Sequence, residues 1–311
     1  MRVWETATGK PVSISHQAKS VFKTVFSPDG RYVLTAGDDH TARLIEAATG
    51  KETLRLAHND SVVSVAFSGD GRLLATGSVD HTARLFDRIS GKDVLTLTVQ
   101  NTSVEAVALS RNGRFLATGG DGQARIFDTA SGRQTAFLKH GGAVEAMEFS
   151  PDGRYLATGC DDQAARLFEV ATGREVLLLP HRDKINAVAF SKDGAVLVTA
   201  SEDRTVRVFG AANGNEVLHI TLDAPPMALH FTDDQAHIAI ARLHNWDTLD
   251  QKTTVLVNTY SLRLQDLVTD GCSQVTRNLT LKEWRQYVGS EVPYHRTCQN
   301  LPLPSMVQGA K

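Results

Sequence analysis

The sequence predicts an all-β fold made of repeated four-stranded units, the arrangement called a β-propeller. One observation is a turn of the form Ser-x-Asp/Asn-Gly that recurs every 40 to 42 residues and begins at Ser27, Ser68, Ser110, Ser150 and Ser191, with a degenerate copy at Thr232. A second is that each period holds four short apolar runs separated by turn residues. A fixed period of about 40 residues with four strands per period indicates radially packed blades.

The stretch 150–190 is the clearest copy of the unit. Pro151 presets φ at the second turn position and Gly153 accepts positive φ, so a tight reversal is expected between the first two strands. Apolar runs then follow at 155–158, 166–169, 176–179 and 185–190, the last of which opens the next unit. The pattern predicts four strands in each unit.

The same register predicts six innermost strands and therefore six blades. These strands are 21–26, 62–67, 104–109, 144–149, 185–190 and 226–231. The chain begins inside a repeat, because Arg2-Val3-Trp4-Glu5 matches a third strand, and this favours a piece of a larger protein. We expect Val12 to His16 to pair beside Val255 to Tyr260 and close six blades; the alternative is that residues 2–17 form part of an incomplete seven-bladed ring.

The segment Thr158 to Glu169, with Thr-Gly-x-Asp-Asp followed by Arg-x-aromatic-acidic, resembles the WD-repeat β-propeller family over residues 1–262. Residues 272–302 resemble the tail of bacterial WD-repeat proteins associated with STAND-type NTPases. We expect residues 263–311 to form a helical extension packed on the propeller, since Thr280 and Glu283 make a capping box. Cys272 and Cys298, within this extension, are predicted to be thiols.

Three columns of polar residues recur from blade to blade, and the resemblance implies a hydrogen-bond network that ties loops to strands. The threonines are Thr35, Thr76, Thr118, Thr158 and Thr199; the aspartates are Asp39, Asp80, Asp121, Asp162 and Asp203; the histidines are His58, His140 and His181. The family's tryptophan is replaced by Ile45 and by Phe86, Phe127, Phe168 and Phe209. Because a catalytic triad would occur once, we interpret the columns as structural. The arginines 43, 84, 125, 166 and 207 are expected to pair with acidic neighbours.

The amino-acid composition indicates which classes of binding partner are not favoured. The 33 basic and 35 acidic side chains give a formal charge of −2, which does not favour nucleic acid or an anionic membrane. No apolar run spans a bilayer and no signal-peptide pattern begins the chain, so we expect a cytoplasmic protein. Motifs for phosphate loops, dinucleotide binding and zinc hydrolysis are absent from the sequence, so neither catalysis nor a cofactor or metal is expected.

The function predicted from the resemblance is a non-enzymatic scaffold or sensor that binds a protein or peptide, with an effector module encoded elsewhere. The alternatives are a small-molecule or metal site in the central channel, and a truncated fragment of a larger effector protein. Ten extra residues predict one long loop around 242–254, and insertions on rigid scaffolds often carry function. The candidate partner-binding residues are Arg242, His244, Trp246 and Asp247 in this loop, and His40, His81, Gln123, Arg182, Lys184 and Arg204 on the face opposite the Ser-x-Asp-Gly turns.

Overall fold

The computed structural model describes residues 1–5, 8–17, 19–99, 102–232, 234–246 and 253–262. Every regular element of this part is a β-strand, which confirms the predicted all-β fold. In the same residues no helix is both long and apolar enough to cross a membrane. The helices predicted within 263–311, with Cys272 and Cys298, lie outside the described residues. The chain divides into two compact units, Met1–Leu229 with Ile240–Val257, and His230–Ala239 with Asn258–Lys311.

Five sheets of four antiparallel strands follow one another in the first unit, and we number them blade 1 to blade 5. Blade 1 contains β3 (Val21–Phe26), β4 (Tyr32–Gly37), β5 (Thr41–Glu46) and β6 (Glu52–Ala57). Blade 2 contains β7 (Val62–Phe67), β8 (Leu73–Ser78), β9 (Thr82–Asp87) and β10 (Asp93–Thr98). Blade 3 contains β11 (Ala106–Leu109), β12 (Phe115–Gly120), β13 (Gln123–Asp128) and β14 (Gln134–Lys139).

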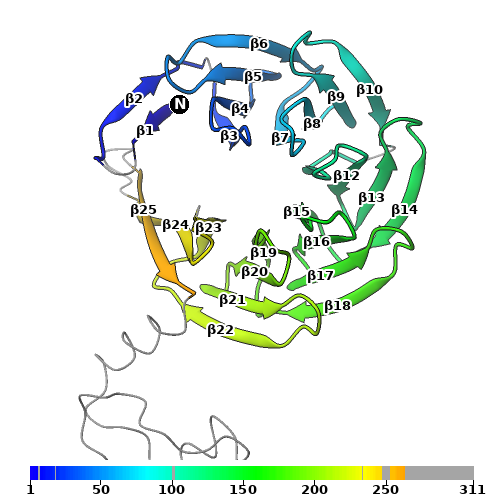
Figure 1. The fold of residues 1–311 in the computed structure, drawn as a ribbon, viewed down its shortest axis with the longest axis vertical. Coiled ribbons are helices and arrows are strands. Elements are labelled where there is room, and N and C mark those ends of the chain that lie inside the picture. The colour runs from blue at the N-terminus through cyan, green and yellow to red at the C-terminus, as the bar shows by residue number, and fades with distance from the viewer. Residues whose placement is uncertain (6–7, 18, 100–101, 233, 247–252, 263–311) are drawn as a thin grey trace, which may run out of the picture. The chain divides into compact units, whose positions relative to one another are not determined.

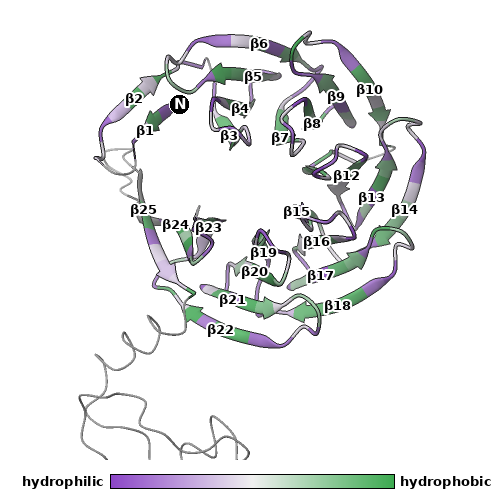
Figure 2. Ribbon diagram, viewed as in Figure 1, coloured by the Kyte–Doolittle hydropathy of each residue, from purple (hydrophilic) through white to green (hydrophobic). Residues whose placement is uncertain are grey.

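Blade 4 contains β15 (Val144–Phe149), β16 (Tyr155–Cys160), β17 (Ala164–Glu169) and β18 (Glu175–Pro180), and blade 5 contains β19 (Ile185–Phe190), β20 (Val196–Ser201), β21 (Thr205–Gly210) and β22 (Glu216–Thr221). In every blade the first strand lies on the inner side and the fourth strand lies on the outer side (Figure 1). The outer strands β10, β14 and β18 carry both hydrophilic and hydrophobic residues (Figure 2), and in each strand the fifth residue is buried between two exposed neighbours.

The predicted turn between the first two strands is present in each blade. In blade 4 the Gly153 amide donates to the Ser150 carbonyl at 2.8 Å, and Gly153 has a φ of 73°. The Ser150 hydroxyl lies 2.6 Å from Asp152 Oδ1 and accepts from the Tyr155 amide at 2.9 Å. Serine and aspartate thus supply local hydrogen bonds that stabilise the reversal.

A three-stranded sheet follows blade 5 and corrects the predicted insertion. It contains β23 (Pro226–Phe231), β24 (His237–Trp246) and β25 (Thr253–Ser261). Strands β24 and β25 are longer than their counterparts in blades 1 to 5, so the predicted loop of residues 242–254 is wrong at 242–246 and 253–254, and residues 247–252 lie outside the described residues. The physical reason is strand propensity: the β-branched residues at 253–255 and 257 favour a strand at the start of β25.

The predicted pairing of Val12 to His16 beside Val255 to Tyr260 is also wrong. Strand β2 (Pro11–Ile14) pairs instead with β1 (Arg2–Trp4) in a two-stranded sheet, with Arg2 opposite Ile14. The reversal is local: Gly9 has a φ of 66°, and its amide donates to the Glu5 carbonyl at 2.8 Å. Closing such a short loop costs less conformational entropy than joining strands far apart in sequence. We call β1 and β2 the N-terminal hairpin.

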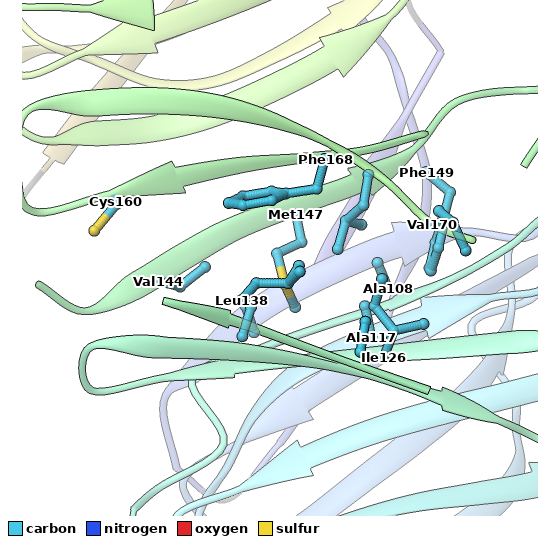
Figure 3. Close-up of a cluster of buried hydrophobic side chains, with 14 residues drawn as sticks. Ala108, Ala117, Ile126, Leu138, Val144, Met147, Phe149, Cys160, Phe168 and Val170 are labelled. Atoms are coloured by element: carbon cyan, nitrogen blue, oxygen red, sulfur yellow. The ribbon is translucent and has the colours of Figure 1, made fainter. Parts of the chain in front are cut away.

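The core of the blades lies in the spaces between neighbouring sheets. Between blades 3 and 4, Met147 and Phe149 of β15 pack against Ala108, Ala117 and Ile126 of blade 3 (Figure 3). Similar clusters join blade 1 to blade 2, blade 2 to blade 3, and blade 4 to blade 5. Because β7, β11, β15 and β19 bury apolar side chains against the preceding blade, the five blades stabilise one another.

Candidate functional site

One end of the five blades carries a repeated backbone conformation that points to a surface for recognition. The turn between the second and third strands has, at the same position in each blade, a residue with positive φ: His40 (63°), His81 (67°), Gly122 (66°), Gln163 (67°) and Arg204 (66°). For residues other than glycine this left-handed conformation is uncommon and costs energy. We call the surface formed by these five positions the turn face.

Backbone hydrogen bonds hold the turn face in place. In each blade the carbonyl of the positive-φ residue accepts from the amide that follows the fourth strand, as in His58 N to His40 O at 2.9 Å and Leu222 N to Arg204 O at 2.8 Å. The side chains of His81, Gln163 and Arg204 remain exposed. The repeat therefore fixes the backbone and leaves the side chains available for contacts.

The predicted network of histidine, threonine and aspartate lies beneath this face. His58 Nε2 is 2.7 Å from Thr76 Oγ1 and His58 Nδ1 is 3.1 Å from Asp80 Oδ2, which joins the end of blade 1 to blade 2. His181 makes the equivalent contact to Thr199 at 2.8 Å. In place of the family's indole contact, the Phe209 ring packs edge-on against His181, with the ring centroids 6.4 Å apart.

Burial and hydrogen bonds within this network determine the protonation states of its histidines and aspartates. Burial lowers the pKa of His181 to about 4, so this side chain is neutral at physiological pH. Burial opposes ionisation of Asp203, but hydrogen bonds from the Thr205 hydroxyl and the Arg182 amide outweigh it and lower the pKa of Asp203 to about 2. A neutral histidine beside an ionised aspartate recurs in blade 2 and here, which supports the structural interpretation of the columns.

Four arginines of the column pair with acids as predicted, whereas Arg125 donates to the Gln123 side-chain carbonyl. Arg166 contacts Asp162 at 2.7 Å and Glu175 at 3.3 Å, and Arg207 contacts Asp203 at 3.5 Å. Arg43 pairs with Asp39 in the same way. These four guanidinium groups are paired with acids of their own blades.

In blade 3 the turn between the second and third strands is one residue shorter than in the other blades, so its residues depart from the aspartate column. Asp121 is exposed there, where the sequence predicted a network member. Gln123, predicted on the face, is half-buried at the start of β13, where its Oε1 accepts from Arg125 at 3.0 Å. Gly122 holds the turn-face position, and Gln163 is the equivalent residue that the sequence analysis missed. Aligning each turn on the Arg column would have found it.

The other predicted site residues are His40, Arg182 and Lys184 on the blades, and the residues of the predicted insertion. His40 lies 3.8 Å from Asp60, and Arg182 is exposed while its amide donates to Asp203 at 3.0 Å. The Lys184 carbonyl accepts from the Glu202 amide at 2.9 Å, in the loop beside the turn of Arg204. These residues share the end of the blades on which the turn face lies.

The described residues of the predicted insertion lie on the lengthened strands β24 and β25. Arg242, His244 and Trp246 belong to strand β24, and Asp247 lies outside the described residues. Arg242 forms an ion pair with Asp223 in the connection that precedes β23. The side chain of Arg242 is only 14% exposed, so its first role is structural.

The inner strands carry two partly buried titratable side chains, Lys23 and Glu148, that the sequence analysis did not identify. Lys23 Nζ on β3 is 3.4 Å from Ser64 Oγ on β7, and Glu148 Oε2 on β15 accepts from the Phe190 amide at 3.3 Å. Burial raises the pKa of Glu148 to about 8 and lowers the pKa of Lys23. Among the described side chains, no three His, Cys, Asp or Glu residues gather as metal ligands do.

The repeated blades define the class of protein as a β-propeller. A family model described as "WD domain, G-beta repeat" matches residues 9–46, 50–87, 91–128, 132–169 and 173–210, which is more than half of the chain. The chain therefore belongs to the WD40 repeat family, whose propellers commonly mediate protein–protein interaction. No curated protein matched the chain in a sequence search.

Proposed function

We propose that the chain is a non-enzymatic interaction module that binds a protein or peptide through the turn face. One observation carries the proposal: equivalent turns have the same strained backbone but different exposed side chains, including His81, Gln163 and Arg204. A rigid scaffold that holds different exposed side chains at equivalent turns is suited to carry a binding surface. The WD40 fold, common among interaction scaffolds, supports the same conclusion.

The charges on this end of the blades favour a polypeptide partner. Exposed Arg182 and Arg204 lie among exposed acids, namely Asp121, Asp161 and Asp183. A polyanion would be repelled by these acids, whereas a polypeptide offers side chains of both signs. The turn face is thus suited to a polar protein surface with mixed charge.

Two residues of strand β24 extend the proposed site. By their order in the sheet, strands β24 and β25 correspond to β4 and β5, between which His40 lies. His244 and Trp246 stand near the end of β24. Tryptophan is enriched at binding hot spots, so we include both residues in the site.

We further infer a bacterial, cytoplasmic setting in which the partner is an effector module encoded elsewhere. The resemblance of residues 272–302 to the tails of WD-repeat proteins associated with STAND-type NTPases supports this inference. The near-neutral charge agrees with a partner that is a protein.

The experiment compares the full chain with a double variant, Arg182→Glu and Arg204→Glu, in affinity capture from a bacterial lysate followed by mass spectrometry. Both side chains are exposed, so the fold should be retained. We expect the variant to lose a specific captured protein by about tenfold or more, which corresponds to about 1.4 kcal/mol.

The matched control is Lys51→Glu with Arg133→Glu, which makes the same change of charge at the turns between third and fourth strands, on the opposite end of the blades. This control should capture the partner as the unchanged chain does. Equal capture by all three proteins, or equal loss in both variants, would refute the turn face as the binding surface.

A further inference from the structure

The N-terminal hairpin occupies the third and fourth strand positions of a blade that precedes blade 1. In the N-terminal hairpin Arg2 lies opposite Ile14 and Val3 lies opposite Ser13, and the register shifts after the second pair. Strands β5 and β6 shift register at the equivalent point, after the pair of Leu44 and Leu54. A Cβ on Gly50 would lie 2.7 Å from the Ile14 carbonyl oxygen. The equivalent glycines of blades 2 to 5 face the fourth strand of the preceding blade in the same way: Gly91, Gly132, Gly173 and Gly214.

Two side-chain contacts confirm this placement. The Ser13 hydroxyl donates to the Ala47 carbonyl of blade 1 at 2.7 Å. Gln17 Nε2 donates to Thr35 Oγ1 at 2.8 Å, which reproduces with an amide the contact that His58 makes to Thr76 at the next interface. The N-terminal hairpin therefore contacts blade 1 as the outer half of a complete blade would.

The inner part of this interface is exposed. On β3, Phe22 is 53% exposed and Phe26 is 58% exposed, and Thr24 between them is exposed too. The residues equivalent to Phe26 in blades 3 to 5 are 5% to 8% exposed: Leu109, Phe149 and Phe190. Those equivalent to Thr24 in blades 2 to 5 are 1% to 8% exposed: Val65, Val107, Met147 and Val188. One apolar face of β3 thus lacks the cover that its counterparts have.

The complete interfaces show what kind of structure provides that cover. Met147 and Phe149 pack against Ala106 and Ala108 on the first strand of blade 3 and against Ala117 on its second strand (Figure 3). Small side chains on these two strands allow the sheets to approach closely. The N-terminal hairpin supplies only third and fourth strands, so the matching cover for β3 is a first-and-second-strand hairpin.

The edge of β1 presents the complementary backbone. Among the described strands β1 has β2 as its only sheet partner, whereas β5 pairs on its other edge with β4, with Arg43 opposite Thr35. Free amide and carbonyl groups along a strand edge are a template for an added strand. The apolar face of β3 and the edge of β1 together form what we call the acceptor site.

We propose that the acceptor site binds a β-hairpin with the sequence pattern of the first two strands of a WD repeat. The second strand of that hairpin pairs with β1. Alanine-sized residues of both strands pack on Phe22 and Phe26, as Ala106, Ala108 and Ala117 pack on blade 4. The proposal adds a second binding surface and does not depend on the turn face.

The test uses the full chain and a fluorescent synthetic peptide with the sequence of residues 103–123, the first-and-second-strand hairpin of blade 3. Fluorescence anisotropy should show saturable binding. A control peptide with Ala108→Asp and Ala117→Asp should bind at least about tenfold more weakly, because the two carboxylates would be buried against β3.

Variants of the chain locate the site. Phe26→Asp should abolish peptide binding without altering the circular dichroism melting curve, because Phe26 is exposed in the free protein. Val217→Asp makes the same kind of change at a side chain that is 70% exposed on β22, and it should leave binding unchanged. Equal binding of both peptides, or full binding by Phe26→Asp, would overturn the proposal.

A covalent version removes any dependence on the folding of the free peptide. Residues 103–123 fused directly before Met1 keep the repeat register, because Arg125 and Arg2 are equivalent positions. The fusion should raise the melting temperature, and Phe26→Asp should cancel the gain; no gain would overturn the proposal. If the chain self-associates and Phe26→Asp abolishes the association, the acceptor site binds a second copy of the chain. If the peptide binds only after truncation at Leu262, residues 263–311 occupy the site. Either outcome also overturns the proposal.

Discussion

At the residue scale, one interface shows that the chemistry of the network tolerates substitution. Gln17 replaces the histidine at the junction of the N-terminal hairpin with blade 1, and it still donates to Thr35 at 2.8 Å. The contact thus requires a hydrogen-bonding nitrogen at a fixed point and does not require a titratable ring. The histidines of the other junctions make stability depend on pH, whereas Gln17 does not titrate.

We predict that His181→Gln will reduce the loss of stability in acid. The pKa of His181 is lowered from 6.5 to about 4 by burial, so between these values the unfolded chain binds a proton that the folded chain does not. Stability is therefore complete above pH 6.5 and falls as the pH falls towards 4. The variant should lie within about 1 kcal/mol of the original at pH 7.5 and lose less at pH 5.

Urea unfolding at pH 7.5, 6 and 5 measures this difference. His140→Gln should act in the same direction, because burial also lowers the pKa of His140 to about 4. If both variants lost stability in parallel with the original chain, the buried neutral histidines would not be a source of the acid dependence.

We predict the opposite pH dependence for Glu148→Gln. Burial raises the pKa of Glu148 from 4.5 to about 8, against the Phe190 amide and the Lys23 charge, which act to lower it. As the pH rises from 4.5 to 8, the unfolded chain loses a proton that the folded chain retains, so this group destabilises the fold progressively. Glutamine removes the ionisation and keeps an acceptor for the Phe190 amide.

The free energy of unfolding of Glu148→Gln, relative to that of the original chain, should therefore increase between pH 5 and pH 8. Chemical denaturation at both values tests it. A constant difference across this range would show that Glu148 ionises as freely in the folded protein as in the unfolded one.

At the scale of the elements, the turns were predictable and the insertion was not. Ser150, Asp152 and Gly153 determine their reversal through bonds within six residues, so the same local sequence produces the same turn in each blade. Extra residues in one blade were equally compatible with a loop or with longer strands. The pairing of β24 with β25 in one sheet decided for longer strands.

We predict that Gly50→Ala will destabilise the protein more than Gly30→Ala. Both glycines have positive φ, 73° and 69°, so alanine should cost about 1–2 kcal/mol at either position. An added Cβ meets nothing within 4 Å at Gly30, but at Gly50 it would lie 2.7 Å from the Ile14 carbonyl oxygen. This clash should add about 1–3 kcal/mol.

Thermal and urea unfolding of the two variants measure the difference, and a deletion of residues 1–16 provides the control. Without the N-terminal hairpin the Gly50 variant should cost no more than the Gly30 variant. If the difference persisted after the deletion, the hairpin would not be packed against blade 1 at this position.

At the scale of the whole molecule, the sequence placed several residues of the candidate site correctly and misaligned one. The repeat register placed His40, His81 and Arg204 in equivalent turns, and the structure confirms that they share one backbone conformation. Gln123 was misplaced because blade 3 is one residue shorter in its turn, and a fixed period cannot show where a missing residue falls. Lys23 and Glu148 escaped notice because they lie on different inner strands, more than a hundred residues apart in the sequence.

The sequence by itself determined the repeat, the four strands of each blade, the turn chemistry and the family, because these depend on interactions within about 40 residues that recur five times. Only the tertiary structure decided which partner β2 takes and which face of β3 stays exposed. Strand β3 begins and ends with an apolar residue, as the other inner strands do. Whether Phe26 is buried depends on the neighbouring strands that the fold places against it, and the sequence of β3 carries no record of them.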